Sequence, residues 1–377
     1  MSEQQVAVIG AGPAGVSVAL SLRDRGLHPL LIDRAHEVGS SWRARYDKLK
    51  LNTGRPFSHL PNRPYPKGTP MYPTRDQVIA HLDRHAREDG IELRLGTPVH
   101  RIDRRPGGWR LDTSSSNIDA RQVVVATGYM HSPYVPDWPG KHRYPGQLLH
   151  SGGYRNPTPY AGSQVLVVGA GSSGMEIAHD LVTGGAAKVW MAVRTPPNIL
   201  LRGGPGGLPG DVLATPCYHL PPRVADAIVR FARRRTIGDL TEFGLPVPAE
   251  GPFTRLASYG VAPAIVDMDV VDAIRDVSIE IVPAVESFDG ATVSLSGGRR
   301  IEPDVVIAAT GYLHGLEPLV GHLDVLDERG VPLAKHGEPA ATGLRFLGFL
   351  TRPSLIGSTG RRSKQVAREI ADELSAA

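Results

Sequence analysis

Cysteine is almost absent from this sequence: Cys217 is the single one among 377 residues. One cysteine excludes an internal disulfide, a CxxC redox pair and a cysteine-based zinc site. Three histidines, His81, His85 and His100, have no carboxylate or cysteine partner at metal-ligand spacing, and we expect no metal centre. Aromatic residues make up only 6% of the chain, and the formal net charge of +4 arises from mixed charges rather than from a basic block. A nucleic-acid partner is therefore not expected.

Long hydrophobic runs are absent as well. The apolar stretch near the N-terminus, Val6–Ile9, is far too short to cross a membrane, and no charged leader segment accompanies it. We therefore expect no membrane partner and a cytoplasmic location. The hydrophobic content of 41% is ordinary for a globular protein, and 377 residues suffice for two domains with separate cores.

Glycine is plentiful, and two glycine-rich turns each follow an apolar strand pattern. In the first, residues 5–9 run into Gly10-Ala-Gly12-Pro13-Ala14-Gly15, and a helical pattern follows over 16–24. Glycine lets such a turn close and lets the backbone approach a pyrophosphate, whose charge the helix N-terminus stabilises. A further strand, residues 30–32, ends at Asp33, eighteen residues after Gly15. An acid at this distance suits the ribose hydroxyls of an adenine dinucleotide.

The second glycine turn, Gly169-Ala-Gly171-Ser172-Ser173-Gly174, lies between a strand pattern at 165–168 and a helical pattern at 175–183. The next strand, residues 188–193, ends at Arg194, twenty residues after Gly174. An arginine at this distance suits the 2′-phosphate of NADP, and a surface arginine that closes a strand is the alternative. Because the second turn supplies the nicotinamide site, we expect FAD at the first turn and NADPH at the second.

An internal repeat indicates how the two sites are arranged along the chain. The segments 126–129 and 309–312 both end a strand pattern with Ala-Thr-Gly-Tyr. We therefore predict an α/β fold with two dinucleotide-binding, Rossmann-like domains, the FAD domain being discontinuous and the NADP domain inserted into it. The expected FAD-binding domain covers 1–155 and 311–377, and the expected NADP-binding domain covers 156–310.

The NADP domain contains an irregular insert at about 196–265. Its glycine-rich stretch 202–210 predicts a mobile loop, and a helical pattern covers 222–235. A second, amphipathic helix is predicted over 76–88 in the other domain, with Thr74 as its N-cap.

The stretch before the second glycine turn, Tyr144-Pro-Gly-Gln-Leu-Leu-His150-Ser-Gly-Gly-Tyr154, resembles the F-x-G-x-x-x-H-x-x-x-[YW] signature of class B flavoprotein monooxygenases. Tyr144 replaces the usual Phe. The final Tyr154 resembles the flavin-containing branch, which oxygenates nitrogen or sulfur, whereas the Baeyer–Villiger branch usually has Trp. The resemblance covers essentially the whole chain and is weakest in the insert.

A second stretch supports the same resemblance. Residues 39–46, Gly-Ser-Ser-Trp-Arg-Ala-Arg-Tyr, are similar to the G-G-x-W-x-x-R-Y stretch of these enzymes, and the neighbouring segments 56–61 and 72–76 resemble plant YUCCA-type and related bacterial members. Plant members usually have His at the position of Asn52. The flavin-containing branch has Asn there, beside the flavin, where it helps to hold the oxygenated intermediate. The resemblance thus implies that Asn52 is catalytic; a simple turn residue is the alternative.

The fingerprints and the resemblance together assign the cofactor-binding residues. These are Gly10, Gly12, Pro13, Ala14, Gly15, Asp33, Arg34, Ser41, Trp42, Val99, Ala126, Thr127, Gly128, Gly169, Gly171, Ser172, Ser173, Gly174, Arg194, Thr195 and Gly311.

The resemblance implies an FAD- and NADPH-dependent monooxygenase that inserts one oxygen atom from O₂ into a small-molecule substrate. Oxygen transfer to nitrogen or sulfur through a flavin C4a-hydroperoxide is the first interpretation, and Baeyer–Villiger-type oxygenation of a ketone or 2-oxo acid, as in YUCCA-like members, is the second. An NADPH-dependent flavin reductase of a non-thiol acceptor and a non-catalytic flavoprotein are the alternatives of other classes. A homodimer is the assembly that we consider.

Overall fold

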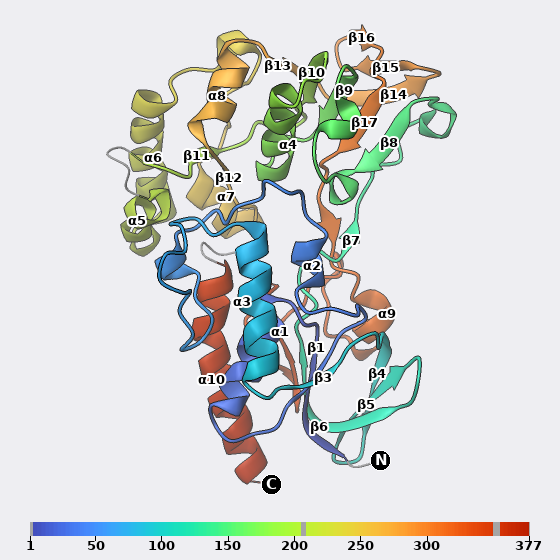
Figure 1. Ribbon diagram of the computed structural model, residues 1–377, viewed down its shortest axis with the longest axis vertical. Helices are drawn as coiled ribbons and strands as arrows, with labels where there is room; N and C mark the ends of the chain where they lie inside the picture. Colours follow the sequence, from blue (N-terminus) through green and yellow to red (C-terminus); the bar gives the residue numbers. More distant parts are fainter. Residues whose placement is uncertain (1–2, 205–208, 350–354, 377) are drawn as a thin grey trace. The chain divides into compact units, whose positions relative to one another are not determined.

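The computed structural model describes residues 3–204, 209–349 and 355–376 (Figure 1). The chain divides into two compact units. The first consists of the residues up to Ala44, Gly54–Ser132 and the residues from Tyr312 onward, and the second of Arg45–Thr53 and Pro133–Gly311. Four residues of the predicted mobile loop, 205–208, lie outside the described residues.

The first unit is built on an eight-stranded sheet. Its strands are β1 (Gln4–Ile9), β2 (Leu30–Ile32), β3 (Glu92–Arg94), β4 (Val99–Arg105), β5 (Gly108–Thr113), β6 (Ile118–Val125), β19 (Pro339–Ala341) and β20 (Leu344–Phe346). The order is β19-β20-β6-β1-β2-β3, and β5 joins β4 to β6. From β20 to β3 all neighbours run parallel, and Val6–Ile9 is buried throughout, as expected for a parallel strand covered on both faces.

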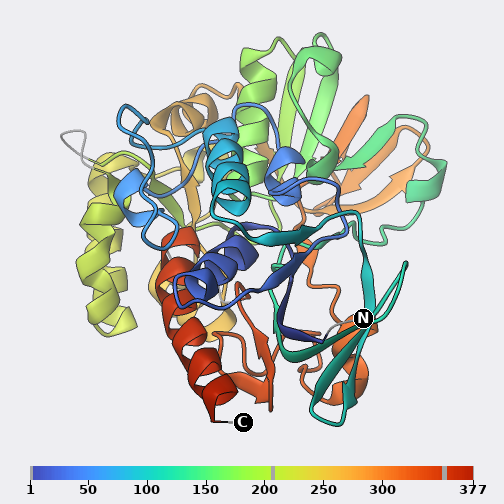
Figure 2. The same cartoon turned by 60° about the horizontal axis from the view of Figure 1, so that its bottom comes forward.

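The helices of the first unit are α1 (Pro13–Arg23), α2 (Ser40–Arg43), α3 (Arg75–Glu88), α9 (Glu317–Val320) and α10 (Leu355–Ser375). Figure 2 shows α10 in red beside α1 in dark blue, and α1 also contacts α3. Small and apolar residues make the stretch from Ala14 to Leu22 of α1 buried without interruption. The predicted cap of α3 is confirmed: the Thr74 side chain accepts a hydrogen bond from Gln77 N, and the Gln77 side chain accepts one from Thr74 N.

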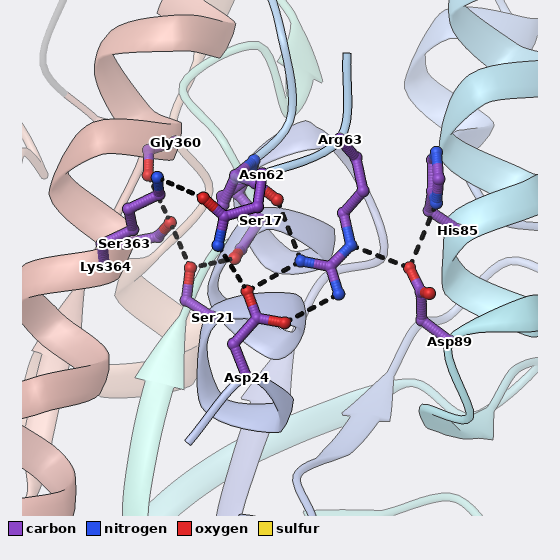
Figure 3. Close-up of polar contacts among 11 residues, drawn as sticks. Ser17, Ser21, Asp24, Asn62, Arg63, His85, Asp89, Gly360, Ser363 and Lys364 are labelled. Atoms are coloured by element: carbon purple, nitrogen blue, oxygen red, sulfur yellow. Dashed lines mark hydrogen bonds and ion pairs between the residues drawn. The ribbon is translucent and has the colours of Figure 1, made fainter. Parts of the chain in front are cut away.

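A polar cluster fastens α1 to its neighbours within the first unit (Figure 3). The Asp24 carboxylate, just after α1, accepts two hydrogen bonds from Arg63, both 2.8 Å long, and one of 2.9 Å from Asn62. Arg63 also donates to Asp89, after α3, and Lys364 of α10 donates to Asn62. These donors, Arg63 first, hold the pKa of Asp24 below its ordinary value.

The second unit is built on a five-stranded sheet in which all neighbours run parallel. Its strands are β8 (Gln147–His150), β9 (Gln164–Val168), β10 (Lys188–Ala192), β13 (Ile279–Val282) and β17 (Val305–Ala308). The order is β13-β10-β9-β17-β8. The helices α4 (Ser172–Thr183) and α8 (Met268–Arg275) pack on it, and β14 (Val285–Asp289), β15 (Thr292–Leu295) and β16 (Arg300–Ile301) form a separate antiparallel sheet. The predicted α/β class with two nucleotide-binding folds is confirmed.

The insert of the second unit is more regular than its sequence suggests. It contains β11 (Ile199–Leu201), α5 (Gly210–Ala214), α6 (Pro222–Thr236), α7 (Pro252–Tyr259) and β12 (Ala264–Val266), and β11 and β12 run parallel. The insert also contains short 3-10 helices at Thr215–His219 and Thr241–Phe243; elsewhere such helices cover Arg55–Phe57, Lys141–Arg143, Ser151–Gly153, Thr158–Tyr160 and Gly321–Leu323. The two-residue strands β7 (Ser132–Pro133) and β18 (Tyr312–Leu313) fall where the chain passes from one unit to the other.

The observed units differ from the predicted domain boundaries at two segments and at Gly311, which was predicted in the FAD domain and belongs to the second unit. Residues 133–155, predicted in the FAD domain, belong to the second unit because β8 pairs with β17. Residues 45–53 also belong there, because the ring of Tyr46 packs in the same apolar core as Tyr154. Both segments thus join the unit in which their strand pairing or their buried tyrosines lie.

Candidate active site and cofactor sites

The first glycine turn joins β1 to α1. Gly15 lies against the turn itself, because a Cβ atom there would come within 1.7 Å of the carbonyl oxygen of Gly10. Gly12 differs, because its Cβ atom would meet only the Ser41 hydroxyl, at 3.8 Å. Gly12 is also the N-cap of α1, and no side chain in the described ranges caps this helix. Open space next to uncapped backbone N–H groups fits the pyrophosphate of a dinucleotide.

Two polar side chains border the first turn. The Asp33 carboxylate accepts hydrogen bonds from the backbone N–H groups of Ala11, at 2.6 Å, and Ala35, at 2.8 Å. It therefore holds the turn in shape while it keeps lone pairs for a ribose hydroxyl. The backbone nitrogen of Thr127 lies 3.0 Å from the Cβ position of Gly10. The Thr127 hydroxyl oxygen is buried and has no hydrogen-bond partner within the described part of the chain, which fits a polar ligand at this place.

The remaining residues predicted to bind at the first turn lie on several elements. Pro13 and Ala14 begin α1, Ser41 and Trp42 lie on α2, Val99 begins β4, and Ala126 and Gly128 follow β6. The N–H group of Gly39, just before α2, donates to Ala11 O at 2.9 Å and so holds α2 beside the turn. Val99 packs on the apolar core of the unit, whereas Arg34 is exposed.

The second glycine turn repeats the geometry of the first. A Cβ atom on Gly174 would lie 1.9 Å from Gly169 O, whereas a Cβ atom on Gly171 would have no neighbour within 4 Å. Gly171 is the N-cap of α4, again without a side-chain cap among the residues that the structure describes. The Ser172 hydroxyl accepts a hydrogen bond from Ile265 N at 2.9 Å, and so ties the helix start to β12. This turn therefore also fits a dinucleotide pyrophosphate.

Three further residues predicted at the second turn lie at strand ends. Arg194 and Thr195 follow β10 and are exposed, and Ser173 is half-buried in the first turn of α4. Gly311 follows β17, and its carbonyl oxygen accepts hydrogen bonds from Tyr134 N and from the ring of His150. The ends of β9, β10 and β17 meet at one edge of a parallel sheet, which is where ligands of such folds bind.

The signature stretch 144–154 fastens β8 to the rest of the second unit. The Tyr144 hydroxyl donates to Pro303 O at 2.6 Å, and the Tyr154 hydroxyl donates to the Asp180 carboxylate of α4 at 2.7 Å. A Cβ atom on Gly146 would lie 2.4 Å from the Asp304 carbonyl oxygen, so the position has no room for a side chain. The hydroxyl that distinguishes Tyr144 from the usual Phe is thus satisfied by a backbone carbonyl.

His150 has a defined tautomer. Its Nδ1 accepts a hydrogen bond from Gly152 N at 3.0 Å, so the proton must lie on Nε2, which donates to Gly311 O at 2.9 Å. Burial is the main cause that lowers the pKa of His150, and the neutral ring fits both bonds. The signature histidine therefore joins β8 to the turn after β17.

Asn52 lies in a half-buried polar cluster of the second unit. Its Oδ1 accepts a hydrogen bond of 3.1 Å from Nη2 of Arg202, a side chain that is 3% exposed. Arg202 also forms ion pairs with Glu176 of α4 and with Asp267, the N-cap of α8. The Tyr46 hydroxyl donates to the other oxygen of Glu176. We call these five residues the Asn52 cluster.

The sequence reasoning missed three members of the Asn52 cluster. Arg202 was assigned to a mobile loop, and this prediction is wrong for Arg202, whose guanidinium is buried between two carboxylates. Glu176 carried a usable signal in the sequence, since this acid stands between the apolar residues Met175 and Ile177 of the helical pattern. Burial raises the pKa of Glu176, with Arg202 opposing it, and burial followed by the Glu176 charge raises the pKa of Tyr46.

The residues that the structure describes contain no group of three or more His, Cys, Asp or Glu side chains that could hold a metal ion. None of the described helices combines the length and the apolar character that a membrane crossing needs.

Comparisons with known proteins agree with this geometry. Residues 7–198 match the pyridine nucleotide-disulphide oxidoreductase family. A probable indole-3-pyruvate monooxygenase of Arabidopsis thaliana, YUCCA3, is 34% identical over 97% of this chain and 86% of its own. The indole-3-pyruvate monooxygenase YUCCA1 of Oryza sativa subsp. japonica is 34% identical over 96% of this chain and 90% of its own.

The fold is also that of solved flavin monooxygenases. The flavin-containing monooxygenase from Stenotrophomonas maltophilia matches with a TM-score of 0.75 and 23% identity, covering 99% of each chain. A chain with one cysteine cannot form the internal dithiol pair of a CxxC disulphide reductase.

Proposed function

The chain belongs to the class B flavoprotein monooxygenases, FAD- and NADPH-dependent enzymes that consume O₂, and on this premise we propose that its substrate is a small 2-oxo acid. The observation that carries the proposal is the likeness, over nearly the full length of both chains, to enzymes named indole-3-pyruvate monooxygenases. Indole-3-pyruvate is itself a 2-oxo acid. When bound, NADPH supplies a hydride and FAD passes the electrons to O₂ for transfer of one oxygen atom to the substrate.

Oxygenation of nitrogen or sulfur is the second candidate. Asn52 stands where the plant members usually have His, and Tyr154 stands where the Baeyer–Villiger branch usually has Trp. These two residues support the flavin-containing branch, and the overall identity supports the 2-oxo acid. The two candidates differ in their products, so that one assay distinguishes them.

We assign FAD to the first unit. Gly12 would leave room for its pyrophosphate, the start of α1 would donate backbone N–H groups to the phosphates, and Asp33 would accept from a ribose hydroxyl. The buried Thr127 hydroxyl, which has no hydrogen-bond partner among the described residues, would gain one from the cofactor.

We assign NADPH to the second unit. Gly171 and the start of α4 would bind its pyrophosphate in the same way. Arg194 is exposed after β10, where its fixed charge and forked donors would bind the 2′-phosphate. In this proposal Asn52 donates a hydrogen bond near the reacting atoms, and the other members of the Asn52 cluster keep it in place.

The decisive experiment measures NADPH consumption with panels of 2-oxo acids, amines, sulfides and ketones under labelled O₂. Our proposal expects a 2-oxo acid to stimulate consumption, to lose its carboxyl group as CO₂ and to gain one labelled oxygen atom. Labelled N- or S-oxides would support the second candidate instead. NADPH oxidation without any labelled product would point to a flavin reductase.

Two properties of the whole protein belong to the same proposal. We place the enzyme in the cytoplasm, where NADPH is available, and we propose a homodimer as its assembly. Cell fractionation tests the location, and light scattering on the purified FAD-loaded enzyme tests the assembly, since a monomer would contradict it.

A further inference from the structure

The Asn52 cluster has a donor–acceptor pattern that constrains how Asn52 can act. We propose that Arg202 is a positioning residue that turns the carboxamide oxygen of Asn52 toward its guanidinium group. The NH₂ group of Asn52 is thereby left to act as the hydrogen-bond donor to a bound ligand. The inference rests on the role proposed above for Asn52 and adds the residue that sets its orientation.

The orientation follows from the chemistry of the guanidinium group. Arginine carries only donors, so the atom of Asn52 that lies 3.1 Å from Nη2 of Arg202 must be the acceptor, Oδ1. A rotated carboxamide would set its NH₂ group against a positive charge and would lose the bond. Since oxygen and nitrogen of an amide are otherwise interchangeable in shape, the charge of Arg202 decides between the two orientations.

Arg202 is itself held on three sides. Its backbone N–H donates to Val266 O at 2.8 Å, which extends the pairing of β11 with β12. Its guanidinium binds Glu176 through Nη2 and Asp267 through Nη1. A planar fork that is 3% exposed and paired with two carboxylates has little freedom to turn, so it presents Nη2 to Asn52 in one direction.

The cluster also connects Asn52 to the second glycine turn. Glu176 lies on α4 two residues after Gly174, and its carboxylate accepts from Arg202 and from Tyr46. Tyr46 and Asn52 belong to the same segment, 45–53, so this segment is bonded to Glu176 of α4 directly through Tyr46 and indirectly through Arg202. The helix proposed to receive the NADPH pyrophosphate thus helps to hold Arg202, which orients the Asn52 amide.

Asn52→Asp tests the orientation without disturbing Arg202. An aspartate keeps an oxygen facing the guanidinium, so the variant should fold with unchanged or higher stability, but it has no NH₂ donor. With FAD, NADPH and O₂ present, its hydrogen peroxide release per NADPH should rise about tenfold or more, for the loss of one bond to a polarised group. Asn52→Ala, which has no side-chain amide, should release peroxide to a similar extent. If Asn52→Asp stays coupled while Asn52→Ala does not, the functional atom is the oxygen and the inference is wrong.

Arg202→Lys tests the positioning residue, with Arg230→Lys on the exposed face of α6 as the matched control. Lysine keeps the charge between the carboxylates but not the fork that reaches Asn52. Selective ¹⁵N labelling of asparagine in the FAD-loaded protein reports the side-chain amide directly, and the Asn52 signal is the one missing from Asn52→Ala. We expect it to shift and to exchange faster with water in Arg202→Lys, with release of peroxide, and to be unchanged in Arg230→Lys.

The possible failures are distinguishable. A coupled Asn52→Ala enzyme would remove the proposed role of Asn52 itself. An uncoupled Asn52→Ala enzyme beside an Arg202→Lys enzyme with an unchanged amide signal and unchanged coupling would remove only the positioning role. If Arg202→Lys does not fold, Asn52→Asp still decides whether the donor or the acceptor of the amide is required.

Discussion

Two glycines of the second turn, Gly171 and Gly174, should differ in how an added methyl group changes the stability of the protein. Gly171 has an extended backbone, with φ −77° and ψ 177°, and a Cβ atom there meets nothing within 4 Å. Alanine is a poorer N-cap than glycine by up to roughly 1 kcal/mol, and the reduced freedom of the unfolded chain returns about 0.4–1 kcal/mol. We therefore expect Gly171→Ala to leave the free energy of unfolding nearly unchanged.

Gly174→Ala should instead destabilise the protein. Its Cβ atom would lie 1.9 Å from Gly169 O and 3.2 Å from the Cβ atom of Ala309, so the turn or α4 must move. Overpacking of this kind costs about 1–3 kcal/mol or more, which corresponds to a fall of roughly 2–10 °C in Tm for a unit of this size.

Gly171→Ala should weaken NADPH binding although it leaves the stability of the protein nearly unchanged. The methyl group occupies the open space proposed for the pyrophosphate, and loss of one charge-assisted hydrogen bond costs about 1.5–3 kcal/mol, or roughly 10- to 150-fold in Kd. Thermal unfolding by circular dichroism and NADP⁺ titration by calorimetry measure the two quantities. Unchanged affinity for NADP⁺ in Gly171→Ala would refute the proposed phosphate site. A fall in the Tm of Gly171→Ala equal to that of Gly174→Ala would refute the conclusion that the space around Gly171 is open.

Three further predictions follow from other parts of the molecule. Gly12→Val should fold but purify without its yellow flavin, since its Cβ atom meets only Ser41 at 3.8 Å; a variant with full flavin absorbance would contradict the FAD assignment. Arg194→Ala should raise the KM for NADPH about tenfold or more and leave that for NADH nearly unchanged; equal use of both coenzymes by the unmodified enzyme would remove the 2′-phosphate site. The pKa of Asp24 is lowered in the folded protein, so its contacts stabilise the folded state at pH values above its ordinary pKa of 3.8, and this stabilisation is lost as the pH falls through the lower pKa of the folded protein. The free energy of unfolding of Asp24→Asn should therefore depend less on pH in this range, and identical pH dependence of the two proteins would contradict this role of Asp24.

The sequence by itself determined the parts of the fold that depend on short-range patterns. A strand, a glycine turn and a helix occupy about twenty consecutive residues, so the turns at Gly10 and Gly169 could be read directly, as could the Thr74 cap of α3. The single cysteine likewise excluded dithiol chemistry without any knowledge of the fold. The glycine turns and the helix cap concern neighbours along the chain, whose geometry is limited by backbone sterics and hydrogen bonding, and the cysteine argument needs only the composition.

Only the tertiary structure decided which distant residues meet. Asn52 and Arg202 are 150 positions apart, and the glycine-rich stretch that begins at Arg202 gave no sign of a buried ion pair. In the same way, β8 was assigned to one domain by its place in the chain and belongs to the other through its pairing with β17. A charged side chain can be buried only where partners from other elements converge, and that convergence depends on how the whole sheet and its helices pack.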